Sequence, residues 1–109
     1  KGFGVGADAA QAAAWYRKAA DQGYATAQNN LGFLYSDGDG VPKDPAQARH
    51  WYLKAAEQGN ASAQNNLGWM YLRGEGVARD AAQARVWFEK SAAQGNKNAQ
   101  EALAHMARQ

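Results

Sequence analysis

Cysteine and isoleucine are absent from this 109-residue sequence, and proline occurs only twice. Without cysteine the chain can form no disulfide, no thiol nucleophile and no cysteine-ligated metal site, which excludes several classes of enzyme. No apolar run approaches the roughly 20 residues of a membrane-spanning helix, so we expect no insertion into a membrane. The net charge is only +2, which argues against a nucleic-acid partner, because nucleic acids are bound by dense basic surfaces.

Sequence motifs of the common enzyme classes are missing as well. The chain has no phosphate-binding loop, no nucleophile elbow and no paired-histidine zinc motif. The acidic string at residues 37–40 lacks the distal glutamate of a calcium loop. His50 and His105 have no second ligand at metal-binding spacing. We therefore expect a protein that is not an enzyme and that holds no metal or cofactor.

Alanine and large aromatic residues are abundant instead, and they recur in a repeat of 36 residues. The string Trp15–Gly23 returns as Trp51–Gly59 and Trp87–Gly95. A second block follows the same step, as Ala27–Gly32, Ala63–Gly68 and, in altered form, Ala99–Ala104. Three units, at about 1–36, 37–72 and 73–109, fill the chain as a single domain. A start within a unit, without methionine, indicates a piece of a longer protein or a repeat-based design.

Each unit carries two helical patterns, and their boundaries are marked by capping residues. Helix caps are expected at Asp8, Asp44, Asp80, Asn60 and Asn96. Pro45 follows its cap at the first helical position, where proline is favoured. The Gly-x-Gly-Val strings, including Gly2–Val5, are expected to be loops. The predicted helices cover residues 8–22, 25–36, 44–58, 61–72, 80–94 and 97–108.

Positions that recur between units are expected to pack, and positions that differ are expected to face the surface. In the middle unit the recurring positions form an apolar stripe: Ala48, Trp51, Tyr52 and Ala55. Gly32 and Gly68 are predicted to lie where a neighbouring helix approaches the backbone closely. A short helical pair cannot bury its apolar face alone, so the units are expected to stack.

The repeated strings Leu-Gly-x-x-Tyr-x-x-Gly-x-Gly-Val and Trp-Tyr-x-Lys-Ala-Ala resemble the Sel-one-like repeat, a relative of the tetratricopeptide repeat. The resemblance covers essentially the whole chain, and the step of 36 favours this family over the 34 of tetratricopeptide repeats. It implies an all-α fold, a right-handed α/α superhelical solenoid of three hairpins. The implied concave face is lined by the Leu-Gly-x-x-Tyr helices and binds a partner protein or peptide, as in an adaptor. Only the family suggests a localisation, in the bacterial periplasm or outside the cell.

A stripe on the second helix of each unit differs between units and is the candidate recognition surface. Asparagine amides can bind a peptide backbone, aromatic rings can bury its apolar side chains, and arginine can pair with a carboxylate. The candidate residues are Asn29, Phe33, Asn65, Trp69, Arg73 and Glu101.

Several alternatives stay open at this point. The two asparagines can simply belong to the repeat's helix, with Phe33 and Trp69 partly in the core. The whole chain can be a consensus-like scaffold without a ligand, or its aromatic ribbon can favour self-association. A β-lactam- or peptidoglycan-binding role is disfavoured, since the subgroup of the family with that role carries a cysteine pair in each repeat.

Overall fold

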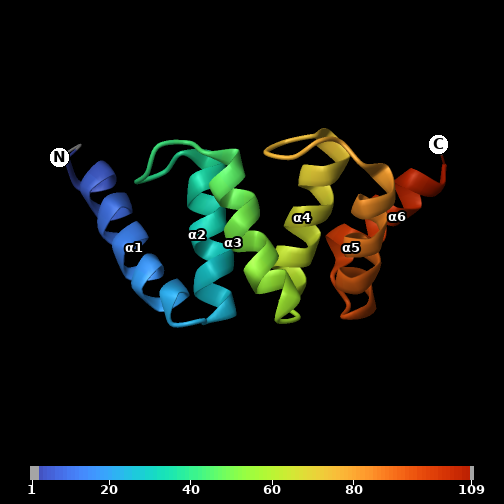
Figure 1. Ribbon diagram of the computed structural model, residues 1–109, viewed down its shortest axis with the longest axis horizontal. Coiled ribbons are helices and arrows are strands. Elements are labelled where there is room, and N and C mark those ends of the chain that lie inside the picture. Colours follow the sequence, from blue (N-terminus) through green and yellow to red (C-terminus); the bar gives the residue numbers. More distant parts are fainter. Residues whose placement is uncertain (1–2, 109) are drawn as a thin grey trace.

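The computed structural model describes residues 3–108, with side chains from residue 9 onward. Within that range the chain forms six α-helices and no strand, and the helices stand side by side in a row (Figure 1). They are α1 (Phe3–Asp21), α2 (Ala25–Asp37), α3 (Pro45–Glu57), α4 (Ala61–Arg73), α5 (Ala81–Ala93) and α6 (Lys97–Ala107). The all-α solenoid of three helical pairs is thereby confirmed.

Capping side chains fix the starts of four of these helices as the sequence predicted. Asp44 and Asp80 accept hydrogen bonds from the backbone N–H groups of Gln47 and Gln83, at 3.2 and 3.1 Å. Asn60 and Asn96 do the same for the N–H groups of Ala63 and Ala99, at 2.8 and 2.9 Å. Each bond satisfies a donor that the first helical turn leaves unpaired.

Helix α1 begins at Phe3, so the prediction of a loop through Val5 and a cap at Asp8 was wrong. Gly2 and the Asp8 side chain lie outside the described residues. In the later loops, a hydrogen bond to the preceding helix holds the backbone: the N–H of Gly38 donates to the carbonyl of Leu34 at 2.7 Å. Residues 3–8 instead form the first turns of α1.

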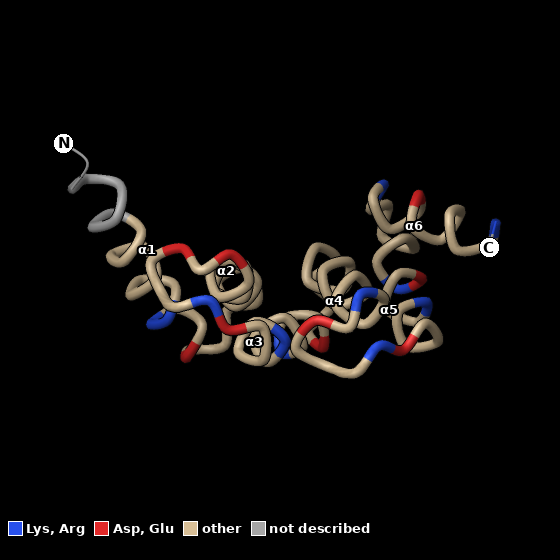
Figure 2. Tube along the Cα trace, turned by 90° about the horizontal axis from the view of Figure 1, so that it is seen from above, with Lys and Arg blue, Asp and Glu red and all other residues tan. Residues whose placement is uncertain are grey.

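The row measures 47 × 25 × 23 Å and is bent along its length. Seen from above, α3 lies on the outer side of the bend, whereas α2 and α4 lie on the inner side (Figure 2). The long loops after α2 and α4 both lie along the upper edge of the row in Figure 1. The second helices of the first two units, α2 and α4, therefore lie on the concave side of the row, and they carry all the candidate residues except Glu101.

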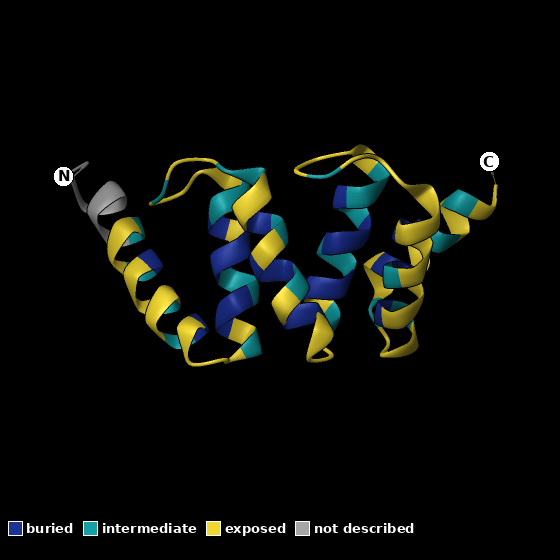
Figure 3. Ribbon diagram, in the orientation of Figure 1, coloured by how far each residue is buried: buried dark blue, intermediate teal, exposed yellow. Residues whose placement is uncertain are grey.

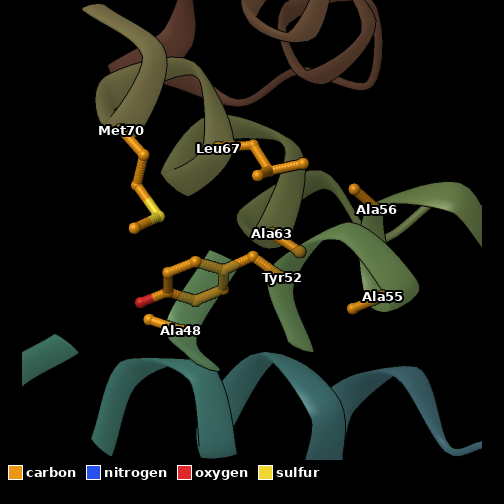
Figure 4. Close-up of a cluster of buried hydrophobic side chains, with 7 residues drawn as sticks. All are labelled: Ala48, Tyr52, Ala55, Ala56, Ala63, Leu67 and Met70. Atoms are coloured by element: carbon orange, nitrogen blue, oxygen red, sulfur yellow. The ribbon is translucent and has the colours of Figure 1, made fainter. Parts of the chain in front are cut away.

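The core runs through the middle of the row, where α2, α3 and α4 hold most of the buried positions (Figure 3). Its central cluster, drawn in Figure 4, consists of Ala48, Tyr52, Ala55, Ala56, Ala63, Leu67 and Met70. Small alanines let the helices approach, and the Tyr52 ring fills the space between α3 and its neighbours. The apolar stripe predicted from the sequence is buried throughout.

Gly32 in α2 and Gly68 in α4 lie at close helix contacts, as predicted. A β-carbon built on Gly32 would lie 2.7 Å from the ring of Tyr52, and one built on Gly68 would lie 2.6 Å from the ring of Phe88. Both rings belong to the first helix of the following unit. The missing side chain is therefore what allows consecutive units to stack at this distance.

Recurrence does not mean burial in every unit, however. Trp51 is only 5% exposed and packs against Ala27 and Leu31 of the preceding pair. Trp15 occupies the same position in the first unit and is 70% exposed. The expectation that recurring positions pack is therefore wrong at Trp15, because no preceding pair covers it within the described residues.

Candidate functional site

The concave face presents two aromatic rings at equivalent positions of α2 and α4, and they differ in their surroundings. Phe33 is 53% exposed and reaches into solvent. Trp69 is half-buried: its ring meets the Phe88 ring edge to face at 5.2 Å, and its Nε1 donates to Asn98 Oδ1 at 2.7 Å. Trp69 thus belongs partly to the core, whereas Phe33 offers a free apolar surface.

Arg73 lies beside Trp69, one turn further along α4. Its guanidinium carbon is 4.9 Å from the centre of the Trp69 ring, which is the distance of a cation–π contact. The Trp69 ring holds the guanidinium in place, while the Arg73 side chain remains exposed. An exposed guanidinium held in this way can still accept a carboxylate from a ligand.

These side chains surround a pocket of about 240 Å³ between α2 and α4. It unites Phe33, Trp69 and Arg73, three of the residues that the sequence singled out. Its other lining residues are Ser36, Asp37, Tyr52, Asn66, Met70 and Glu75. The acidic residues of this set, Asp37 and Glu75, were missed. Asp37 ends α2 and Glu75 lies in the loop after α4, and the sequence does not give the position of either relative to the pocket.

Tyr52 contributes a neutral phenol to this pocket. Burial of the ring, followed by the negative charge of Asp37, raises the pKa of Tyr52 above its ordinary value, and a hydrogen bond with Ser36 opposes the shift only in part. The phenol therefore keeps its proton at physiological pH. Tyr52 acts as a hydroxyl partner or an apolar wall, and it adds no charge beside Asp37.

Asn29, the asparagine predicted on α2 to bind a ligand, forms hydrogen bonds within the protein. Asn29 Nδ2 donates to Ser62 Oγ at 3.2 Å, and Asn29 Oδ1 accepts from Asn66 Nδ2 at 3.1 Å. These bonds join α2 to α4 across the concave face. Asn66 was missed as a functional residue, although the Asn29-Asn30 pair and its repeat at Asn65-Asn66 were visible in the sequence.

The equivalent asparagine on α4 has a different environment. The Oδ1 atom of Asn65 is buried and has no hydrogen-bond partner among the described residues. The donor that Asn66 supplies to Asn29 is missing one unit later, because residue 102 is alanine. Glu101, the remaining candidate, is exposed on α6 and does not line the pocket.

Replacing Asn29 by alanine is expected to lower the free energy of unfolding by about 1–2 kcal/mol, since two hydrogen bonds worth about 1 kcal/mol each are lost. The same change at Asn65 is expected to alter it by less than about 0.5 kcal/mol, because no bond is broken there. Urea denaturation followed by circular dichroism measures both values. An equal loss at the two sites would contradict the assignment of the bonds.

Two further features of the described part of the chain bear on function, its ionisable side chains and the length of its apolar helices. No three His, Cys, Asp or Glu residues there are placed to hold a metal ion. None of the described helices is both long and apolar enough to cross a membrane. The concave face combines a pocket, an exposed ring and a held charge.

Comparison with known proteins places this arrangement in a family. The family model described as Sel1 repeat matches three consecutive segments, residues 1–24, 25–60 and 61–96. The chain belongs to the Sel1 repeat family. The two complete segments have the 36-residue length found in the sequence, and each begins close to the start of a concave-face helix, α2 or α4.

Three solved structures are similar to this Sel1 repeat chain. They are c5321, a protective antigen of uropathogenic Escherichia coli with an SLR fold (TM-score 0.88, 46% identity), a Sel1 repeat protein from Oxalobacter formigenes (0.83, 44%) and cysteine rich protein B from Helicobacter pylori (0.76, 29%). The matches cover 89%, 84% and 80% of this chain, but only 21%, 27% and 65% of those chains. No curated protein matches the sequence.

Proposed function

We propose that this Sel1 repeat chain is an interaction module that binds a peptide segment of a partner protein on its concave face. The family generally mediates protein–protein interactions, and its repeats are generally scaffolds without catalysis. The observation that carries the proposal is the exposed ring of Phe33, which stands at a pocket also lined by Trp69 and Arg73. Large exposed rings beside a held arginine are typical of binding hot spots.

The contacts suggest how a segment is held. Phe33 covers an apolar side chain of the ligand, and the pocket between α2 and α4 receives it. Arg73 pairs with a carboxylate, and the acidic residues Asp37 and Glu75 at the same pocket favour a nearby basic group. The asparagines contribute less than the sequence suggested, because Asn29 is bound to α4 and the Oδ1 atom of Asn65 is buried.

The double substitution Phe33→Ala and Arg73→Ala tests this function. Partners captured by the immobilised chain are identified by mass spectrometry, and their binding segment is titrated by calorimetry. We expect the double variant to bind about 2 kcal/mol or more weakly, the loss expected when a hot spot is truncated. Trp69 is left intact, since its truncation would also remove the contact with Phe88.

Val86→Ala provides a matched control, because Val86 is also an exposed large hydrophobic residue and lies on α5. It is expected to bind as tightly as the unaltered chain. Equal binding by the double variant would show that the concave face is not the recognition surface. A folded chain that captures no partner would support the scaffold alternative.

A further inference from the structure

Another pocket, of about 440 Å³, lies at the junction of the first two units. Its polar and aromatic lining comes from α1, α2 and α3 and consists of Arg17, Asp21, Gln28, His50, Trp51 and Lys54. None of these residues lines the pocket between α2 and α4 on the concave face. A ligand bound at this junction is therefore separate from a peptide bound on the concave face.

The junction pocket carries more positive than negative charge. Arg17 and Lys54 bring two positive charges, Asp21 brings one negative charge, and His50 adds an imidazole N–H. Asp21 Oδ1 accepts a hydrogen bond from Arg17 Nε at 3.3 Å. This bond orients the guanidinium and leaves its two Nη groups to donate to a ligand. The charge of the pocket favours an anion.

The indole of Trp51 adds a donor that the protein leaves unpaired. Trp51 is 5% exposed, and its Nε1 atom is buried without a hydrogen-bond partner among the described residues. The buried amide of Gln28, by contrast, donates through Nε2 to the carbonyl of Ala20 at 3.2 Å. A buried N–H without an acceptor is unfavourable, and an oxygen supplied by a ligand removes that cost. The pocket is therefore short of an acceptor and not of a donor.

Two exposed side chains lie against the Trp51 ring. The guanidinium carbon of Arg17 is 5.5 Å from the centre of the ring. The His50 ring meets it edge to face, with the ring centres 5.0 Å apart. Exposed side chains change rotamer readily, so both can turn toward a ligand and open the way to the indole. The donors of α1 and α3 can then converge on one bound group.

The second junction, between α3 and α5, has lost two of these groups. Leu53 stands where α1 has Arg17, and Val86 stands where α3 has His50. Leu53 packs against the central cluster of the core. The lysine position alone keeps its positive charge. The repeat therefore stacks without the arginine and the histidine, which leaves these residues of the first junction available for binding.

We propose that the junction pocket binds the phosphate group of a small solute. A phosphate presents three acceptor oxygens, enough for donors that approach from both α1 and α3. Arg17 and Lys54 neutralise its charge, while His50 and the Trp51 Nε1 atom donate to the remaining acceptor positions. The volume of the pocket is that of a small-molecule site.

Titration with inorganic phosphate at constant ionic strength tests the site through the indole N–H signals of a nitrogen–proton correlation spectrum. The four tryptophans give one such signal each, and a Trp51→Phe variant identifies the signal of Trp51. We expect this signal to move downfield and to saturate, because its N–H gains an acceptor, while the signal of Trp87 stays in place. Acetate, with two acceptor oxygens, is expected to bind about tenfold more weakly.

The double substitution Arg17→Leu and His50→Val gives the first junction the residues of the second. It is expected to weaken phosphate binding about tenfold or more, since charged donors are lost. Lys18→Leu is the matched control, because it removes a positive charge from α1 at a residue that does not line the pocket. This control is expected to bind phosphate as tightly as the unaltered chain, and circular dichroism checks that both variants fold.

Several results would overturn the proposal. A Trp51 signal that phosphate leaves in place, or that moves equally in the double variant, would show that the pocket is not the site. Acetate binding as tight as that of phosphate would contradict the choice of ligand. Co-sedimentation with vesicles that contain phosphatidic acid, without binding of inorganic phosphate, would assign the pocket to a lipid headgroup and not to a small solute.

Discussion

Replacing Trp51 by alanine is expected to lower the free energy of unfolding by about 3–5 kcal/mol, the range found when a large buried ring is removed. Trp51 is almost fully buried between α3 and the first helical pair. Its Nε1 atom has no hydrogen-bond partner among the described residues, so the loss comes from packing and not from a broken bond. Urea denaturation, followed by helical circular dichroism, measures the change.

Trp15→Ala is the matched control for this experiment, since it removes the same side chain from the equivalent position of the first unit. Its ring is mostly in solvent, so a change of less than about 0.5 kcal/mol is expected at a concentration where the chain is monomeric. Equal losses at Trp15 and Trp51 would mean that the first helical pair does not cover Trp51 as the structure shows.

Replacing Gly68 by valine is expected to cost about 3 kcal/mol or more, because inserting side-chain atoms into a packed core forces rings and backbone apart. A β-carbon alone would lie 2.6 Å from two atoms of the Phe88 ring. Phe88 is fully buried, so its ring is enclosed by the core. The same denaturation experiment measures the loss, and Gly68→Ala is expected to give a smaller loss in the same direction.

The third unit supplies the control for the Gly68→Val variant. Ala104 stands at the equivalent helical position but is exposed, so Ala104→Val is expected to cost only about 0.5 kcal/mol through its lower helix propensity. If valine at residue 68 were tolerated as well as valine at residue 104, the close approach of α4 and α5 at Gly68 could not be correct.

Most of the fold could be predicted from the sequence because its signals are local and repeated. The caps at Asp44 and Asn60 fixed the helix starts, and the 36-residue step fixed the order of the units. The exposed Trp15 and the early start of α1 could not be predicted by comparing units. Both depend on what lies before a segment in space, and the first unit has no neighbour there within the described residues.

The candidate site was predictable only in part. Phe33, Trp69 and Arg73 were identified from their spacing on the helices, and they do line one pocket. The roles of the asparagines could not be identified in this way, because the sequence of a single helix does not reveal that Asn29 reaches Ser62 on another helix. Asp37, at the end of α2, and Glu75, in the loop after α4, join the pocket through the placement of these segments in space, which the sequence does not give.

The row of helices has a consequence for the way the chain unfolds. Among the described helices, packing is almost entirely between neighbours in the sequence. Such an array has no central structure that must be lost all at once, and its stability is close to a sum of terms for single pairs and their junctions. Within residues 3–108, the middle pair, α3 and α4, is joined on both sides, whereas each outer pair is joined on one. Opening can therefore begin at either end, with the middle pair the last part to lose its structure.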